Sequence, residues 1–155
     1  DCADIYGNLY NWYVVDDDRG VCPEGWHVPS DEEFMGLEMY LGMSEEEANS
    51  AGQRGTDEGS KLAGNSDLWW GGMDGVLENN SEFGTSGFDA LPAGVRDDAA
   101  YGAFYGMGGG SVFLSSSAHN SNYAWGRYLN FASSCVYRYY NNYKRYGFSI
   151  RCLQD

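Results

Sequence analysis

The chain has 155 residues and a formal net charge of −14 at pH 7, which is distributed unevenly. Residues 1–117 hold 22 of the 23 acidic side chains and four of the nine basic ones, whereas residues 118–155 hold one acid and five bases. The acidic body would repel phosphate, so we expect no nucleic-acid partner. The length fits a single domain over residues 1–155, and no run of about 18 apolar residues is present to span a membrane.

The four cysteines, Cys2, Cys22, Cys135 and Cys152, contain no CxxC pair, and there are only two histidines. This pattern argues against a structural zinc site. Four cysteines allow three sets of disulfides, and their spacing does not choose among them. The cysteines are compatible with an oxidising compartment.

The N-terminal segment 6–15 is aromatic and β-branched after Gly7-Asn8, which predicts a strand. Asp16, Asp17 and Asp18 follow it and predict a solvated turn. Clustered carboxylates are also what calcium binds, so a structural calcium site is the alternative there, and we expect no other cofactor.

Two short helices are predicted next. Ser30 and Glu33 form a capping-box pattern ahead of a stripe of apolar residues, Phe34, Leu37 and Leu41. Ser44 and Glu47 repeat the pattern and open an acidic helix that ends near Gly52. His27 lies in the rigid segment before the first helix, where we expect a structural hydrogen-bonding role and not a general base.

The middle of the chain predicts loops and then strands. Residues 53–86 lack periodicity, and we expect Trp69-Trp70 either to seal this long loop onto the core or to line a sugar site. Residues 87–96 predict a strand bent at Pro92. Strands at 111–115, 123–131, 134–140 and 147–153 follow, and we expect the last three to be consecutive and antiparallel, with Phe148, Ile150 and Cys152 inward.

The tail, residues 118–146, mixes core-forming residues with an unusual polar set. Trp125, Leu129 and Val136 have strand-like spacing, and the rest of the tail is rich in Asn, Ser, Gly and Arg and holds seven of the chain's 13 tyrosines. Rigid aromatic rings combined with small polar side chains are typical of recognition surfaces, because Tyr gives a large contact area at a low entropy cost. The alternative is a tyrosine-rich sheet with one solvated face.

Several blocks in chain order, at residues 7–12, 22–34, 61–62, 87–97, 115–117, 124–125 and 147–153, resemble the Fibrobacter succinogenes major paralogous domain family, which is common in Bacteroidetes. The resemblance implies an α+β domain of the C-type-lectin-like fold, with two short helices, a twisted antiparallel sheet and long loops. It also implies a disulfide between Cys22 and Cys152, which would contribute roughly 3–5 kcal/mol. Cys2 and Cys135 would then remain unpaired.

The tail itself resembles the variable region of proteins diversified by retroelements, in which adenine mutagenesis converts Asn codons into codons for residues such as Tyr, Ser, Gly, Arg and Cys. On this resemblance residues 118–146 form a variable ligand-binding region. The expected contacts are His119, Tyr123, Gly126, Arg127, Tyr128, Cys135, Tyr137, Tyr139, Tyr140, Asn141, Asn142, Tyr143, Arg145 and Tyr146. The expected fixed scaffold is Ala124, Trp125, Leu129, Phe131, Ser133, Ser134, Val136, Lys144, Gly147 and Phe148.

The function implied by this resemblance is binding of a protein ligand on a cell or phage surface. Carbohydrate binding is the alternative, because exposed Tyr and Trp rings can stack on sugars, although the calcium-dependent lectin tripeptides are absent. We expect no enzyme, since the chain offers no nucleophile or acid–base pair with an orienting partner. The setting would be extracellular or the cell surface, on a pilus tip, a lipoprotein or a phage particle. The oligomeric state stays open.

Overall fold

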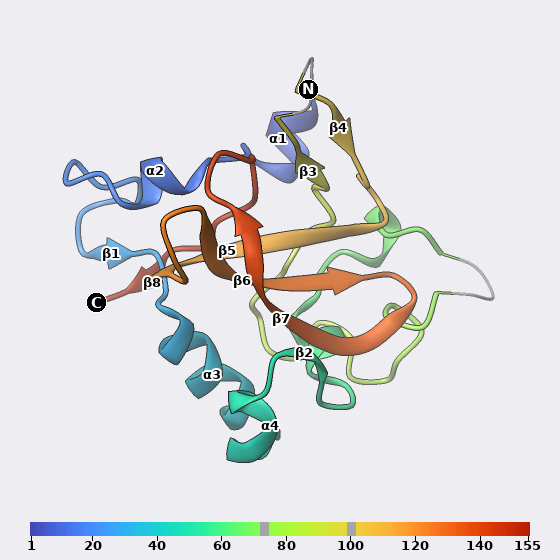
Figure 1. The fold of residues 1–155 in the computed structure, drawn as a ribbon. Helices are drawn as coiled ribbons and strands as arrows, with labels where there is room; N and C mark the ends of the chain where they lie inside the picture. The colour runs from blue at the N-terminus through green and yellow to red at the C-terminus, as the bar shows by residue number, and fades with distance from the viewer. Residues whose placement is uncertain (72–74, 99–101) are drawn as a thin grey trace.

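A computed structural model describes residues 1–71, 75–98 and 102–155. The described residues form an α+β arrangement in which β5, β6 and β7 cross the centre of the molecule (Figure 1). The elements are α1 (Cys2–Tyr6), α2 (Trp12–Val15), β1 (Trp26–His27), α3 (Asp31–Tyr40), α4 (Glu45–Asn49), β2 (Gly52–Arg54), α5 (Glu58–Leu62), the 3-10 helix η1 (Ser66–Leu68), β3 (Val95–Arg96), β4 (Phe104–Tyr105), β5 (Gly110–Ala118), β6 (Tyr123–Asn130), β7 (Ser133–Tyr143) and β8 (Leu153–Gln154).

Both predicted helix starts are confirmed. At α3 the Ser30 hydroxyl accepts from the Glu33 amide at 3.1 Å, while the Glu33 carboxylate accepts from the Ser30 amide at 2.8 Å. Ser44 and Glu47 make the same reciprocal pair at α4. Each capping box pairs backbone N–H groups that the start of a helix otherwise leaves without a partner. Because the residues involved are only three apart in sequence, the pattern predicts the helix start without knowledge of the fold.

The strand predicted at residues 6–15 is wrong. The segment begins at the last residue of α1 and ends with α2, and between them Tyr10 makes a strand-like bridge to Phe148. Asn11 caps α2 by accepting from the Val14 amide. Trp12 is 5% exposed and donates its indole N–H to the Ser115 carbonyl, whereas Tyr13 is 57% exposed. Burial of one large ring and a local cap decide the conformation here, over β propensity.

The main sheet has the strand order β2-β7-β6-β5 and is antiparallel. The predicted strands at 111–115 and 134–140 are confirmed as parts of β5 and β7, and the one at 123–131 is confirmed as β6, which ends one residue earlier at Asn130. The expectation that 147–153 continues this series is wrong. Ser149 pairs in parallel with Phe113 on β5, and the chain then reaches β8, which pairs with β1. Phe148 is buried as expected, but Ile150 and Cys152 are only half-buried.

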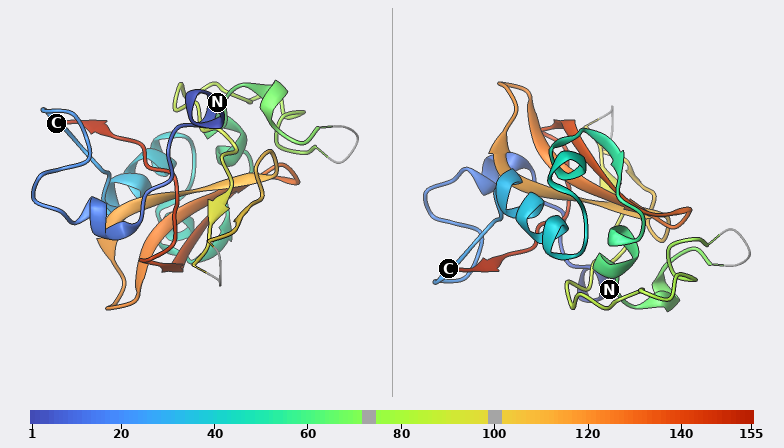
Figure 2. Two further views of the ribbon diagram at one scale, coloured as in Figure 1. Left: turned by 90° about the horizontal axis from the view of Figure 1, so that it is seen from above. Right: turned by 90° about the horizontal axis from the view of Figure 1, so that it is seen from below.

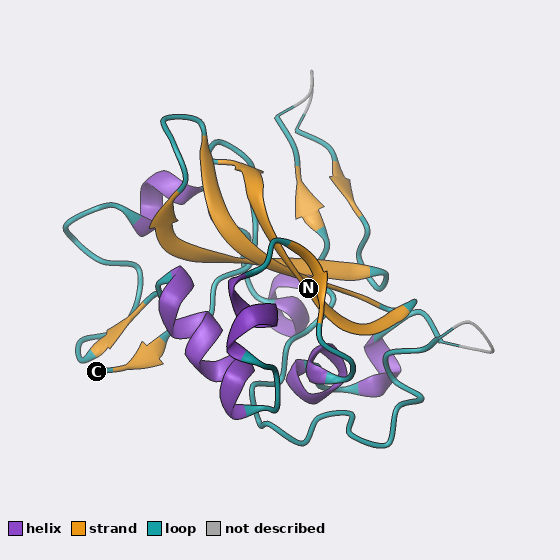
Figure 3. Cartoon of the chain, turned by 60° about the horizontal axis from the view of Figure 1, so that its bottom comes forward, coloured by secondary structure: helices purple, strands orange, loops and turns teal. Residues whose placement is uncertain are grey.

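Each face of the sheet covers its own core. One core, beneath α3 and α4, includes Phe34, Phe113, Leu129 and Val136. Figure 2, in the view from below, and Figure 3 show these helices on one side of the strands, with the β3–β4 hairpin projecting on the other. A second core gathers Trp12, Val112, Leu114, Ala124 and Phe148. Successive residues of β5 therefore point into different cores, with Phe113 in the first and Val112 and Leu114 in the second.

The segment 53–86 is more ordered than predicted, because it contributes β2, α5 and η1; residues 72–74 lie outside the described residues. Trp69 is buried and donates to the Gly64 carbonyl, which confirms its anchoring role. Trp70 is 53% exposed. Residues 87–96, predicted as a bent strand, supply isolated bridges at Ala90 and Gly94 and then β3.

The disulfide between Cys22 and Cys152 is confirmed, and it joins positions 130 residues apart in sequence. It ties the turn before β1 to the start of β8. Cys2 and Cys135 are free thiols, the first exposed and the second half-buried. Within the described residues no helix combines the length and apolarity needed to cross a membrane.

Candidate ligand-binding surface

The register of β6 and β7 sorts the tail residues onto two faces. Arg127 lies opposite Arg138, and both contact Asp31 of α3. The next pair, Tyr128 and Tyr137, must point to the other face, because neighbouring residues of a strand alternate. The expected contacts are therefore divided between the helix-covered face and the opposite, more open one.

Three tyrosines form a cluster on the open face. The ring centroids of Tyr128 and Tyr137 lie 5.6 Å apart, and Tyr139 lies 5.7 Å from Tyr137 and 6.5 Å from Tyr128. All three are half-buried. Burial, together with the neighbouring phenols, raises the pKa of Tyr128, and burial with Tyr137 raises that of Tyr139. We call these three residues the tyrosine cluster; a tyrosine hydroxyl can both donate and accept hydrogen bonds.

A second group, the loop cluster, consists of Tyr123, Tyr143 and Tyr146. The ring of Tyr143 lies 4.6 Å from Tyr123 and 5.0 Å from Tyr146. Tyr146 packs against the same core as Tyr128, so each of the two clusters has one member in contact with that core. The exposed Arg145 stacks over Tyr143 at 4.8 Å and pairs with Asp98.

A third group lies on the helix-covered face, at the end of the β5–β6 hairpin. His119 and Tyr140 have ring centroids 4.6 Å apart, and both contact Trp125. Arg138 stacks on Trp125 with its guanidinium carbon 4.0 Å from the ring centroid. Tyr140 and the neighbouring Asn141 are exposed. We call His119, Trp125 and Tyr140 the hairpin-end cluster.

Three expected contacts lie inside the protein, and this corrects the sequence-based expectation. Gly126 is packed so closely that an added Cβ would lie 3.0 Å from the Phe113 carbonyl oxygen. Asn142 is 7% exposed and its amide donates to the carbonyls of Ala124 and Tyr139. Arg127 is 1% exposed. A further expected contact, Cys135, turns its thiol toward the Gly55 carbonyl at the sheet edge.

Arg127 belongs to a buried charge network. Its Nε donates to Glu38 Oε1 and its Nη1 to Asp31 Oδ1, both at 2.6 Å. Arg54 pairs with Glu38, and Arg138 pairs with Asp31. Burial raises the pKa of Asp31, but the hydrogen bonds and charges of Arg138 and Arg127 outweigh that effect and lower it. The network joins α3 to β2, β6 and β7, so it holds the backbone beneath the exposed side chains.

The signal for this network was present in the sequence. Asp31 and Glu38 lie at i and i+7, on the same helix face as Phe34, and all three are buried. Two acids on an apolar stripe require basic partners in the core. Arginines in a tail with recognition-type composition looked like contact residues, so the pairing was missed.

Most of the expected scaffold residues are indeed interior. Buried members are Ala124, Leu129, Ser133, Val136, Lys144, Gly147 and Phe148, whereas Trp125, Phe131 and Ser134 are half-buried. Even the lysine has a packing role, since Lys144 Nζ lies 3.9 Å from the Trp12 ring centroid. The expected scaffold residues are thus the more buried ones in the tail. Gly126, Arg127 and Asn142, which were expected as contacts, are buried with them.

Residues outside the tail extend the open face. A pocket of about 170 Å³ lies beside Tyr128, and its other side chains are Trp70, Val95, Tyr105 and Phe131. Its remaining lining is backbone, at Gly94, Gly106, Gly109 and Gly110. Trp70 and Tyr105 carry exposed fractions of 53% and 51%. Nothing in the sequence indicates that these aromatic residues, which are far apart along the chain, lie together beside Tyr128. This part of the surface was therefore not predicted.

Comparison with known families fits this arrangement. The model of the Fibrobacter succinogenes major domain matches residues 2–154. The chain belongs to that family. No match was found among curated proteins or among solved structures. The matched residues include both helix caps, both cysteines of the disulfide and the whole tail. The tail is therefore part of the family domain.

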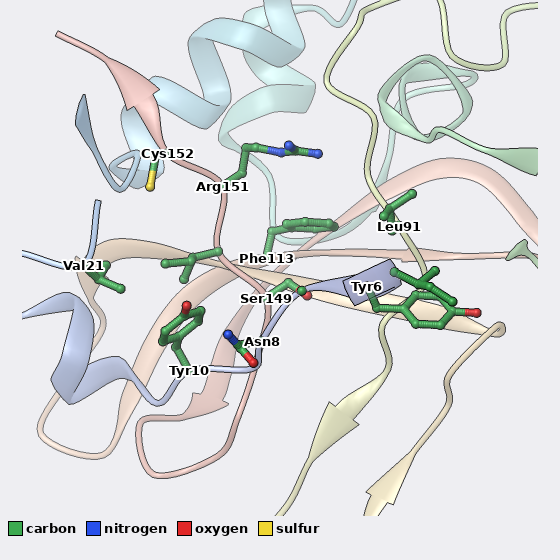
Figure 4. Close-up of a pocket in the computed structure, with 12 residues that line it drawn as sticks. Tyr6, Asn8, Tyr10, Val21, Leu91, Phe113, Ser149, Arg151 and Cys152 are labelled. Atoms are coloured by element: carbon green, nitrogen blue, oxygen red, sulfur yellow. The ribbon is translucent and has the colours of Figure 1, made fainter. Parts of the chain in front are cut away.

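A separate pocket of about 360 Å³ lies between the N-terminal segment and residues 149–152 (Figure 4). Tyr6, Asn8 and Tyr10 line it from one side, and Phe113 lies near its centre. None of the expected tail contacts lines it. It therefore adds nothing to the tail surface.

The residues weighed for catalysis or metal binding have structural partners. His27 bonds Asp155 through Nδ1 at 2.6 Å and Glu33 through Nε2 at 2.9 Å, so both ring nitrogens have hydrogen-bond partners, as expected. Asp17 pairs with Arg19. Across residues 1–71, 75–98 and 102–155 there is no group of three His, Cys, Asp or Glu side chains placed to hold a metal.

Proposed function

We propose that this chain is a ligand-binding domain of the C-type-lectin-like fold, whose tail is diversified by a retroelement and recognises a protein ligand on a cell or phage surface. The observation that carries the proposal is that six tail tyrosines gather in two ring clusters, the tyrosine and loop clusters, each of which has one member packed on the same core. Tyr is enriched at interface hot spots, and a held backbone lowers the entropy cost of binding.

The support for diversification is the separation of roles within the tail. Most side chains that hold the fold are buried, and most of those that a mutated Asn codon could encode are at least partly exposed. Such a surface tolerates change of side chains because the network around Asp31 and Glu38 fixes the strands from the opposite face. The disulfide favours an exported protein, at the cell surface or on a phage.

Carbohydrate binding is the alternative, and the hairpin-end cluster favours it. His119 and Tyr140 present stacked rings beside the exposed Asn141, a combination of aromatic face and amide that suits a sugar. This group and the tyrosine cluster lie on opposite faces of β7. The two functions therefore predict different contact residues.

Adjacent tyrosines provide the matched test. The chain would be screened against arrays of cell-surface proteins and of glycans, with and without calcium. For a protein hit, Tyr139→Ala should reduce affinity by about 10-fold or more, as for a hot-spot residue, whereas Tyr140→Ala should change it little. Sugar binding lost in Tyr140→Ala and retained in Tyr139→Ala would establish the alternative instead.

The diversification claim has its own test. Sequencing the genomic neighbourhood should reveal a reverse transcriptase gene and an Asn-rich template repeat matching residues 118–146. A neighbourhood with neither would remove diversification from the proposal, and the binding test would stand independently of it.

A further inference from the structure

The pocket between the N-terminal segment and residues 149–152 has the size of a small-molecule site. Its volume of about 360 Å³ lies within the roughly 300–1,000 Å³ that such sites occupy. Its walls come from segments far apart in the chain, among them Tyr10, Leu91 and Arg151 (Figure 4). None of the lining residues belongs to the tail, so this pocket is separate from the proposed ligand-binding surface.

The walls of the pocket are held in place by backbone pairing and by the disulfide. Tyr10 and Phe148 exchange backbone hydrogen bonds of 2.7 and 2.9 Å. The amide and the carbonyl of Ser149 both pair with the backbone of β5, and Cys152 is bonded to Cys22. The two walls are therefore fixed before a ligand arrives, which lowers the entropy cost of binding.

The middle of the pocket is apolar. Phe113 is 4% exposed and lies near the centre of the pocket in Figure 4. Its ring packs edge-on against Phe88, with centroids 5.5 Å apart, and Leu91 and Ile150 line the pocket beside it. A ring or a branched aliphatic group placed against these side chains would lose contact with water and gain close packing.

The charge that lines the pocket is positive. Among the described residues of its wall none is acidic, and the basic one is Arg151. Its Nη2 donates to the Asp89 carbonyl at 2.7 Å, and its guanidinium carbon lies 5.3 Å from the Phe88 ring centroid. Within the described part of the chain no carboxylate forms an ion pair with this guanidinium. In a chain with 23 acidic and nine basic side chains, such an arginine is available to an anion from outside.

The opposite end of the pocket carries neutral polar groups. In Figure 4 the side chains of Asn8 and Tyr10 lie on one side of Phe113, and that of Arg151 lies on the other. Across residues 1–71, 75–98 and 102–155 neither the Asn8 amide nor the Tyr10 hydroxyl has a hydrogen-bond partner. An amide and a phenol can each donate and accept, so together they suit a hydroxyl group.

We propose that this pocket binds a small hydroxylated organic acid, with its carboxylate at Arg151, its ring or branched body against Phe113 and its hydroxyl at Asn8 and Tyr10. The inference goes beyond the proposed function, because it assigns a second ligand, of a different kind, to a site outside the tail. A carboxylate is ionised at neutral pH and matches the geometry of a guanidinium.

Two probes of nearly equal size and opposite charge test the site on the full chain. Titration with 4-hydroxyphenylacetate at low salt should shift the amide resonances of Gly7, Asn8, Ile150 and Arg151 saturably, with a dissociation constant of about 0.1–1 mM. Tyramine has the same phenol but ends in an ammonium group, and it should bind at least about 10-fold more weakly. Phenylacetate lacks the hydroxyl and should bind about two- to ten-fold more weakly.

Substitutions assign each end of the ligand. Arg151→Gln should remove the preference for the acid over tyramine, and the comparison of two probes within one variant does not depend on its stability. Arg145→Gln is the matched control, because it removes the same charge from an exposed side chain that does not line the pocket, and it should keep the preference. Asn8→Ala should reduce the preference for 4-hydroxyphenylacetate over phenylacetate.

The opposite results are equally definite. Absence of saturable shifts at the four amides would overturn the site, and equal binding of tyramine would overturn the place of the carboxylate at Arg151. Shifts confined to Leu37 and Leu153, which line a different pocket, would also overturn it. These outcomes are separate from the Tyr139→Ala test, since no tail residue lines the pocket.

Discussion

Arg127 distinguishes a fold-holding residue from a contact residue, and its replacement by Ala is the sharpest test of the structure. The guanidinium is 1% exposed and donates to both carboxylates of the network and to the Asp31 carbonyl. Its removal leaves Glu38 paired with Arg54 and Asp31 paired with Arg138. Neither carboxylate is left without a partner, so the loss should lie at the lower end of the range for broken buried ion pairs.

We therefore expect Arg127→Ala to lower the free energy of unfolding by about 3 kcal/mol. For a domain of this size each kcal/mol corresponds to roughly 2–4 °C in melting temperature, so the decrease should be about 6–12 °C. Arg127→Lys should also destabilise, because one ammonium cannot reproduce the fork that reaches both acids.

Thermal unfolding followed by circular dichroism measures this, with Arg145→Ala as the control. Arg145 also pairs with a carboxylate, Asp98, but its side chain is 56% exposed, so its loss should cost less than about 1 kcal/mol. The buried-network assignment would be refuted by an Arg127→Ala variant that melts within about 2 °C of the unmodified chain. That result would mean that the Arg127 side chain is exposed and lies outside the network.

The remaining predictions concern the C-terminal segment. Hydrogen bonds that the ring N–H groups of His27 donate to the carboxylates of Asp155 and then Glu33 raise its pKa above the ordinary 6.5. The protonated ring therefore stabilises the fold below about pH 6.5 and loses this effect as pH rises through the raised pKa. His27→Ala should lower the melting temperature more at about pH 5.5 than at about pH 9, and an equal decrease at both would contradict this. Replacing both Cys22 and Cys152 by Ser should cost roughly 4–5 kcal/mol, measured by urea unfolding. Cys135→Ser is the control and should cost under 1 kcal/mol, since it loses one weak thiol hydrogen bond.

The parts of the fold that the sequence predicted are those decided locally. The capping boxes at Ser30 and Ser44 involve residues three apart, and both helices begin where expected. Strands β5 to β7 follow alternation and were found as well. The segment at Trp12 was not, because its conformation depends on burial against Ser115, a residue 103 positions away.

The candidate surface shows the same division. Tyr128 and Tyr139 were expected as contacts from the composition of the tail and from its family resemblance, whereas the face on which they lie is set by strand register. Arg127 was wrongly expected to be exposed, because charged residues usually lie at the surface. Only the two acids on the buried face of α3 indicate that an arginine must be buried beside them. The contribution of Trp70 and Tyr105 depends on distant segments meeting at Tyr128, which no local pattern encodes.

The buried network also limits which tail positions could vary under the proposed diversification. An Asp at position 127 would place a third carboxylate beside Asp31 and Glu38, and a Tyr would need space that the guanidinium now fills. At position 126 any side chain would meet the Phe113 carbonyl. Variation compatible with folding is therefore confined to the outward positions.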